Sequence, residues 1–174
     1  MSSPAASAAM ERLAESPLFE PMQTADGSAT VYVLTRRVAP LQQSFYFVND
    51  AWSRDARWLW FYCAHPPASG KTLGVIDFER QTIHHYPETQ FDSGGASPFI
   101  EPETGVAYWS SGRTIWRRSP EPDDPPEPVN ELPEEFIGGR QFNRLATHLT
   151  RSADGRAFFV DSQFGLQWWL GALP

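Results

Sequence analysis

A repeated unit of a polar turn followed by an aromatic strand constrains the fold of this chain more than any other feature. The unit occurs three times, at residues 53–57 before 58–62, at 101–105 before 106–109, and at 151–156 before 157–160. Each turn has the chemistry of an Asp-Gly turn, and each strand is rich in Trp, Tyr, Phe or Val. This pattern is typical of β-hairpins.

The spacing of the three units indicates how the hairpins are organised. Aligning Ala56 with Gly105 and Gly155 gives spacings of 49 and 50 residues, and makes Trp60, Trp109 and Phe159 equivalent. A period near 50 with several strands per unit is typical of β-propeller blades rather than helical repeats. We therefore predict an all-β fold of antiparallel strands arranged as blades.

The repeat also predicts the boundaries of about three blades, at residues 44–90, 91–137 and 138–174, with the first inner strand at 44–52. Residues 1–28 form an N-terminal extension, with a short alanine-rich helix at 4–15. The strand at 29–35 has no partner in its own unit and would complete the last blade of a closed propeller. Propellers close with roughly four to eight blades, so we expect an incomplete propeller that self-associates through open blade edges.

Composition and charge narrow the class of partner. Aromatic residues make up 14% of the chain, with sixteen prolines and twelve glycines, which suits strands separated by many turns. The formal charge is -7, and seven acids with no base lie within residues 119–135. The other 14 acids balance the 14 bases, so no basic excess points to nucleic acid. We expect residues 119–135 to be a solvated loop, with a partner site as the alternative.

The sequence also indicates in which cellular compartment the protein is located. No apolar run approaches the roughly 18 residues of a membrane span, so no membrane partner is expected. Residues 1–15 lack the basic and apolar regions of a secretory signal. Cys63 is the only cysteine, and we expect it to be a small buried hydrophobe. These features favour a cytoplasmic protein.

Several segments carry a resemblance to a known family. They are Gln-Gln-Ser-Phe-Tyr-Phe at 42–47, the run from Trp52 to Phe61, Asp-Ser-Gly-Gly at 92–95 and, most distinctive, Arg-Gln-Phe-Asn-Arg-Leu-Ala-Thr-His-Leu-Thr at 140–150 followed by 152–156. Together they resemble the oligogalacturonate lyases, which are seven-bladed propellers. The resemblance covers residues 27–174 and implies that the chain corresponds to the N-terminal half of such a propeller.

The resemblance implies a function in pectin breakdown. Members of the family carry out β-elimination on short uronate oligosaccharides with a divalent metal such as manganese. Their metal ligands lie mainly in the C-terminal blades, so the resemblance assigns no metal ligand to this chain. Gln42 and Gln43 stand where relatives can have a basic or imidazole group. We therefore expect this chain alone to be inactive.

Candidate substrate-binding residues lie at the starts of the inner strands. Arg144 and His148 are four residues apart, which places both side chains on one side of a strand. An arginine guanidinium binds a uronate carboxylate through two parallel hydrogen bonds. The alternative is that these residues only satisfy channel or inter-blade hydrogen bonds. The full set of candidates is Arg140, Asn143, Arg144, His148, Asp92, Ser93 and Gln43.

Other residues, and the function itself, have more than one interpretation from the sequence. His84 and His85 point to opposite faces of a strand, so we do not expect them to share a metal ion, and His65 is expected to be an exposed loop residue. For residues 92–95 a plain tight turn is the alternative to a ligand loop. As a function, the alternatives are a non-catalytic propeller that binds sugars or scaffolds a protein partner, and a half-propeller that pairs with another chain.

Overall fold

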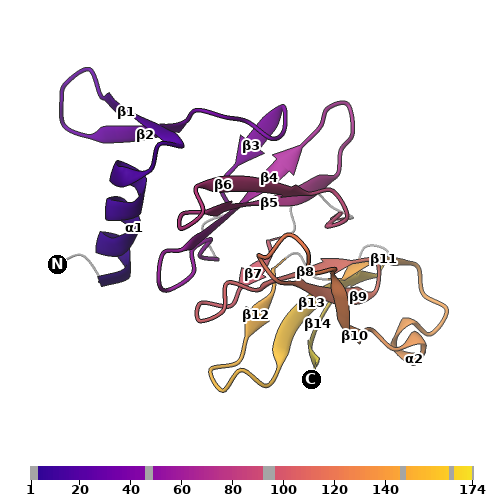
Figure 1. Cartoon of the computed structure of the whole chain (residues 1–174). Coiled ribbons are helices and arrows are strands. Elements are labelled where there is room, and N and C mark those ends of the chain that lie inside the picture. Colours follow the sequence, from indigo (N-terminus) through magenta and orange to yellow (C-terminus); the bar gives the residue numbers. More distant parts are fainter. Residues whose placement is uncertain (1–3, 46–48, 92–96, 146–147, 165–166, 174) are drawn as a thin grey trace.

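Antiparallel β-sheets make up most of the structure, as the sequence predicts (Figure 1). The computed structural model describes residues 4–45, 49–91, 97–145, 148–164 and 167–173. Three four-stranded sheets follow one another along the chain, and a two-stranded sheet precedes them. Each four-stranded sheet is called a blade below and is numbered in chain order.

Blades 1 and 2 are simple meanders in which each strand pairs with the next. Blade 1 consists of β3 (Leu41–Gln43), β4 (Trp58–Ala64), β5 (Lys71–Asp77) and β6 (Thr82–Tyr86). Blade 2 consists of β7 (Phe99–Ile100), β8 (Ala107–Ser111), β9 (Thr114–Arg118) and β10 (Glu127–Glu131). The four-residue helix α2 (Glu134–Ile137) leads from blade 2 to blade 3.

Blade 3 has the same order but a broken inner strand. It consists of β11 (Phe142–Leu145), β12 (Thr150–Arg151), β13 (Phe158–Phe164) and β14 (Gln167–Leu173). Both β11 and β12 pair with β13, and β14 pairs with β13 along its whole length. Two short strands therefore take the place of one inner strand.

The inner strand of blade 1 is also broken, which corrects the strand predicted at 44–52. The ladder of β3 ends at Gln43, and pairing resumes only at an isolated bridge between Trp52 and Leu59. The register shifts between these two points, because Gln43 lies opposite Tyr62 whereas Trp52 lies opposite Leu59. Residues 44–45 and 49–51 therefore lie outside the ladder, and the described part of the run from 44 to 52 is not one continuous strand.

Apolar side chains fill the space between the blades. The cluster between blades 1 and 2 contains Trp58 and Trp60 from one side and Ala107 and Trp109 from the other. The indole N–H of Trp60 donates to the Gly105 carbonyl across this boundary, at 2.8 Å. A second cluster joins blades 2 and 3 and contains Tyr108, Ile115, Leu132, Ile137, Leu145, Leu149, Phe158, Val160 and Phe164.

The equivalence of Trp60, Trp109 and Phe159 is wrong by one residue in blade 2. In the turns of blades 1 and 3, the residue with positive φ comes three positions after Ser53 and Ser152. In the turn of blade 2, it comes four positions after Glu101. Counted from the strand residue whose carbonyl accepts the hydrogen bond that closes each turn, Tyr108 is therefore the equivalent of Trp60. Trp60 faces blade 2 and Tyr108 faces blade 3, whereas Trp109 faces back toward blade 1.

The N-terminal segment covers the face of blade 1 that points away from blade 2 (Figure 1). This segment, called the cap below, comprises α1 (Pro4–Glu15), where the sequence predicts a helix, and a hairpin of β1 (Phe19–Gln23) and β2 (Thr30–Leu34). The expectation that the strand at 29–35 has no partner is wrong, since β2 pairs with β1 over five residues. Its completion of a last blade stays a prediction.

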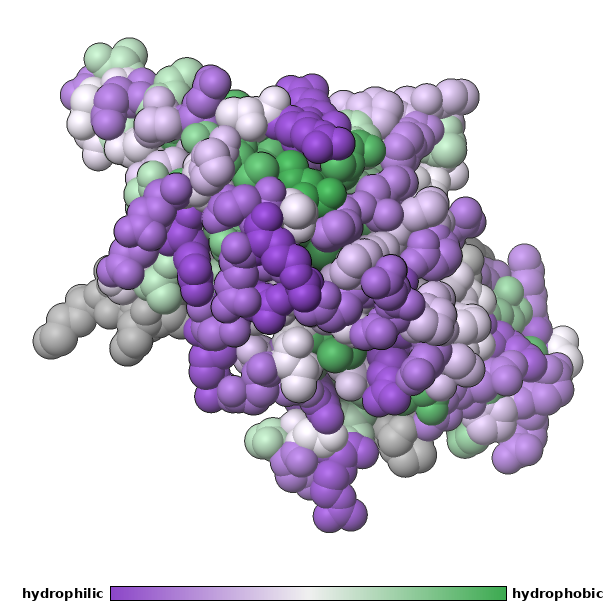
Figure 2. Space-filling view, viewed as in Figure 1, coloured by the Kyte–Doolittle hydropathy of each residue, from purple (hydrophilic) through white to green (hydrophobic). Residues whose placement is uncertain are grey.

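Aromatic stacking and a part-buried hydrogen bond attach the cap. Phe19 stacks on Phe78 of blade 1 with ring centroids 5.9 Å apart. The Ser16 hydroxyl donates to the side-chain oxygen of Gln81 at 2.6 Å. Figure 2 shows apolar surface gathered between the cap and blade 1. A cavity of about 400 Å³ lies there, lined among others by Phe19, Leu34 and Phe61.

The acidic stretch at 119–135 is more ordered than the solvated loop we expected. It contains β10 and the start of α2, and four of its seven acids form ion pairs with arginines of blades 1 and 2. The paired acids are Glu121, Glu127, Glu131 and Glu134. The stretch therefore neutralises surrounding arginines and contributes the outer strand of blade 2.

Neither helix in the described part of the chain is long and apolar enough to cross a membrane.

Candidate functional site

The inner edges of all three blades meet at one side chain. The amide nitrogen of Asn49 donates to the Pro98 carbonyl of blade 2 at 2.6 Å and to the Leu149 carbonyl of blade 3 at 3.3 Å. A parallel β-bridge also joins Ser97 to His148. The breaks in the inner strands allow this convergence, because residues outside a ladder have backbone groups free to bond to neighbouring blades.

A lysine and a buried tyrosine extend this convergence into blade 1. The ammonium of Lys71 lies 4.6 Å from the centroid of the Tyr62 ring and donates to the Gln43 side chain at 3.3 Å. Burial raises the pKa of Tyr62 to about 12, while the Ser97 side chain acts on it in the opposite direction. Gln43, Lys71 and Tyr62 are joined by side-chain contacts, and they are grouped here with the backbone bridge between Ser97 and His148 as the inner-strand site.

The tyrosine side of the site is rigidly packed. Tyr62 contacts Phe45 with ring centroids 4.8 Å apart and Phe91 with centroids 5.7 Å apart. A neutral, buried phenol presents a hydroxyl that can bond to a ligand oxygen without changing charge. The site thus sets the Lys71 ammonium against a buried phenol ring, beside the backbone bridge that includes His148, and a cation of this kind suits a carboxylated ligand.

Arg144 and His148 each precede a leucine, Leu145 and Leu149, that packs in the cluster against blade 2. They do not share one strand, because β11 ends at Leu145 and His148 forms only an isolated bridge, so their common orientation stays a prediction. Arg144 lies opposite Gln163 in the register of β11 and β13. Both Arg144 and His148 are half-buried.

The remaining candidates are not brought together in the same way. Arg140 donates from Nε to the Ile137 carbonyl at 3.0 Å, and its guanidinium lies 4.2 Å from the Phe164 ring centroid, so it holds the end of α2. Asn143 is exposed and lies at a register shift in β11. Asp92 and Ser93 lie outside the described residues.

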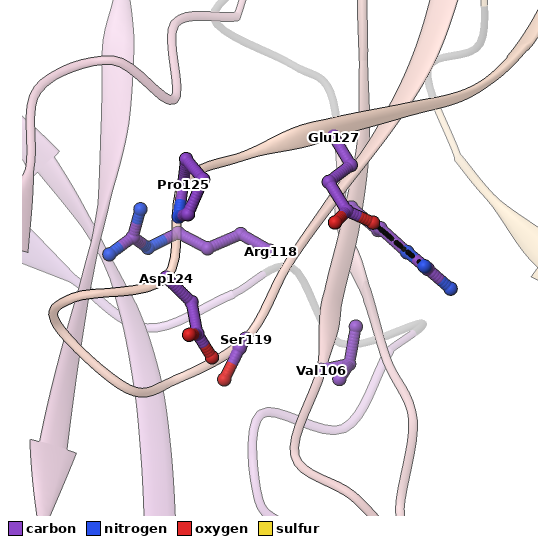
Figure 3. A pocket seen from close by; sticks show the side chains of 7 residues that line it. Val106, Arg118, Ser119, Asp124, Pro125 and Glu127 are labelled. Carbon is purple, nitrogen blue, oxygen red and sulfur yellow. Dashed lines mark hydrogen bonds and ion pairs between the residues drawn. The ribbon is translucent and has the colours of Figure 1, made fainter.

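A separate cavity of about 310 Å³ lies beside the acidic stretch (Figure 3). Its charges are largely paired, since Arg117 binds Glu127 at 2.7 Å and Arg118 binds Glu88 at 2.5 Å. The Arg118 guanidinium also lies over the Tyr86 ring, 3.4 Å from its centroid. This cavity contains none of the candidate residues, and its buried arginine serves to join blades 1 and 2.

Sequence reasoning missed Lys71, which is the only lysine in the chain. Its contact with Tyr62 bridges two neighbouring strands, so no local motif marks it. The signal that could have revealed it is compositional, because thirteen of the fourteen basic residues are arginine and the single exception starts a strand.

Manganese, which the resemblance implies, has no fitting donor set among the described residues. Within that part of the chain, no group of three or more His, Cys, Asp or Glu side chains could hold a metal ion. Divalent ions of this kind need several such ligands or many oxygens to bind firmly.

Comparison with known proteins supports the fold but does not show a family. No family model matches the sequence, and no curated protein matches it. An oligogalacturonate lyase in complex with manganese is similar in structure, with a TM-score of 0.55 and 17% identity over 83% of this chain. A prolyl endopeptidase structure aligns over 98% of this chain and 29% of its own, with 12% identity and a TM-score of 0.48.

The structural similarity extends over only part of the lyase. The chain covers 36% of the length of that protein. The likeness concerns the fold, and the described residues form consecutive blades without a closed ring. The comparison therefore agrees with the predicted all-β blade architecture.

Proposed function

We propose that this chain forms the N-terminal blades of a propeller that binds short uronate oligosaccharides for β-elimination. The observation that carries the proposal is the inner-strand site, where Lys71 lies against Tyr62 and binds Gln43 near the meeting point of three blades. The likeness of the blades to an oligogalacturonate lyase supports this choice of substrate class.

The chemistry of the substrate determines the role that each side chain has in this proposal. β-Elimination removes the proton next to the uronate carboxylate, and negative charge grows on that carboxylate in the transition state. Lys71 and Arg144 would bind the carboxylate groups, Arg144 through a two-point contact. Gln43 and Tyr62 would bind ring hydroxyls. The base that removes the proton must lie within hydrogen-bond reach of it.

This chain is proposed to bind substrate without turning it over. It spans 36% of the similar lyase, and the described residues provide no metal-binding group of three ligands. Binding therefore tests the proposal more directly than activity does. A neutral sugar-binding or scaffolding propeller, the alternative from the sequence, would not distinguish a uronate from its ester.

Calorimetric titration with trigalacturonate tests the proposal. We expect Lys71→Met and Arg144→Ala each to weaken binding about tenfold or more, since each removes a charge-assisted hydrogen bond of roughly 1.5–3 kcal/mol. Arg156→Ala is the matched control, because it removes one positive charge from an exposed turn of blade 3. Equal weakening by all three variants, or no binding by the native chain, would overturn the proposal.

A further inference from the structure

Two histidines from separate segments meet at the edge of blade 1, away from the inner-strand site. His65 directly follows β4 and lies in the connection to β5, whereas His85 lies in the outer strand β6. Their ring centroids are 5.1 Å apart and the rings are inclined by 31°. Since β5 lies between β4 and β6 in the sheet, the contact ties the loop to the outer strand.

A hydrogen-bond relay reaches one nitrogen of His85. The Thr72 hydroxyl lies 2.8 Å from Nε2 of His85 and 3.5 Å from the Cys63 carbonyl. When Thr72 donates to that carbonyl, its oxygen accepts from an N–H at Nε2 of His85. This tautomer leaves a lone pair on Nδ1, the nitrogen that the relay does not use.

That arrangement is the one found around histidines that bind metals. A ligating imidazole donates its other N–H to an oxygen, which fixes the orientation of the ring and makes it a better ligand. Metal–nitrogen distances of about 2.0–2.1 Å in a tetrahedral site place two imidazole centroids about 5 Å apart. The observed separation of 5.1 Å matches this value.

We propose that His65 and His85 form a two-histidine site for a borderline divalent cation, with Zn²⁺ as the occupant and water in the remaining positions. Two imidazoles without carboxylates suit Zn²⁺, Ni²⁺ or Cu²⁺, whereas Mn²⁺ is the weakest of these ions for a nitrogen site. The site is thus distinct in chemistry from the manganese of the similar lyase. A bound ion would clamp the 65–70 loop onto β6 and stiffen the edge of blade 1.

The two rings differ in exposure, and His85 is half-buried in β6. His65 itself is exposed, so an ion can reach the pair from solvent. His84 is engaged differently, with Nε2 2.9 Å from the Thr82 hydroxyl and its ring stacked beside Tyr86.

Titration of the whole chain with Zn²⁺, followed by proton–carbon NMR of the imidazole rings, tests the proposal. The chain contains four histidines, so four sets of ring signals report on all of them. We expect the signals of His65 and His85 to shift together and saturate at one equivalent, while those of His84 and His148 stay in place. Mn²⁺ should bind at least tenfold more weakly than Zn²⁺.

Variants separate a chelating pair from adventitious binding. His65→Ala, at an exposed position, should abolish saturable binding, and Thr72→Val should weaken it about tenfold or more by removing the relay. His84→Ala is the matched control on the same strand and should bind like the native chain. The proposal is wrong if His65→Ala binds Zn²⁺ as tightly as the native chain, or if all four histidines shift alike.

Discussion

At the scale of single residues, turn glycines and one buried carboxylate hold the blades in register. Ala56, Gly105 and Gly155 all have positive φ, which is the conformation that the Asp-Gly-like turns require. Gly105 has a second role, because Trp58 packs directly against its α-carbon. Asp77, whose side chain is fully buried, joins two arginines to the backbone of the β5–β6 turn.

Substituting Gly105 tests the role of the close approach to Trp58. A Cβ at this position would lie 2.7 Å from Cδ1 of Trp58, in a backbone conformation with φ of +71°. Gly27 has nearly the same φ, +68°, but no atom within 4 Å of an added Cβ. Both alanine variants bear left-handed strain of about 1–2 kcal/mol, and Gly105→Ala should lose a further 1–3 kcal/mol, roughly, from overpacking.

Urea unfolding of the two glycine variants measures this difference directly. A larger loss for Gly105→Ala than for Gly27→Ala assigns the excess to the contact between blades 1 and 2. Equal losses would mean that the indole moves aside without cost, and that the packing at this boundary is looser than described.

Asp77 makes the stability of the native state depend on pH in the acid range. Burial would raise the pKa of this carboxyl, but hydrogen bonds from Arg57 and from the backbone N–H groups of Arg80 and Glu79 outweigh burial and hold the pKa below 3.8. A carboxyl whose pKa is lowered by folding stabilises the native state above its unfolded pKa. That stabilisation is lost as the pH falls through the folded value.

The pH dependence of unfolding in Asp77→Asn measures this contribution. The variant should be less stable than the native chain by about 3 kcal/mol near neutral pH, because it leaves the arginines without their buried partner. The difference should shrink as the pH falls below about 4. A difference that stays constant from about pH 7 to about pH 3 would show that the charge of Asp77 is irrelevant to stability.

At the scale of the elements, local sequence patterns predict the hairpins well and their long-range partners poorly. The turns at 53–57 and 151–156 share the same side-chain hydrogen bonds, with Ser53 bonding to Asp55 and Ser152 to Asp154, so the repeat is visible in the sequence. The middle turn places its left-handed residue one position later, which shifted the predicted equivalence of Trp109. No composition signal reveals such a shift.

The strand β1, which pairs with β2 in the cap, was missed for a related reason. The strand β1 has the sequence Phe-Glu-Pro-Met-Gln, whose proline and charge argue against a strand when read locally. It forms because β2 offers a partner and because Phe19 stacks on Phe78. Burial against blade 1 therefore overrides a weak local preference.

The single cysteine provides a test of the cap. Cys63 is fully buried in the cluster beneath the cap, and burial raises the pKa of its thiol to about 12. The thiol should therefore react slowly with a thiol-specific reagent in the native chain. Phe19→Ala should raise the labelling rate about tenfold or more by loosening the cap.

A matched substitution distinguishes local loosening from general destabilisation. Phe159→Ala removes the same side chain from the open face of blade 3, where Phe159 is 47% exposed, and should leave the rate unchanged. If Phe159→Ala accelerates labelling as much as Phe19→Ala does, the thiol reports on global unfolding and the cap does not protect it.

At the scale of the whole molecule, the blades form a stack with one covered end and one exposed end. The cap covers blade 1, whereas Phe159 lies on the face of blade 3 that points away from blade 2. Self-association through such faces stays a prediction, as does the substrate. The sequence predicts Arg144 and His148 on one face, but not Lys71, Tyr62 or Asn49, because the contacts of these residues join segments far apart in the chain.

The NMR signal of Lys71 during a ligand titration tests the central claim, that the inner-strand site binds a uronate carboxylate. Because Lys71 is the only lysine, ¹³C-dimethylation gives one lysine signal in addition to the N-terminal amine, and it preserves the charge. With trigalacturonate this signal should shift and saturate, and with the fully methyl-esterified trisaccharide the affinity should fall at least about tenfold. A Lys71 signal that does not move, or that responds equally to the acid and its ester, would contradict the account.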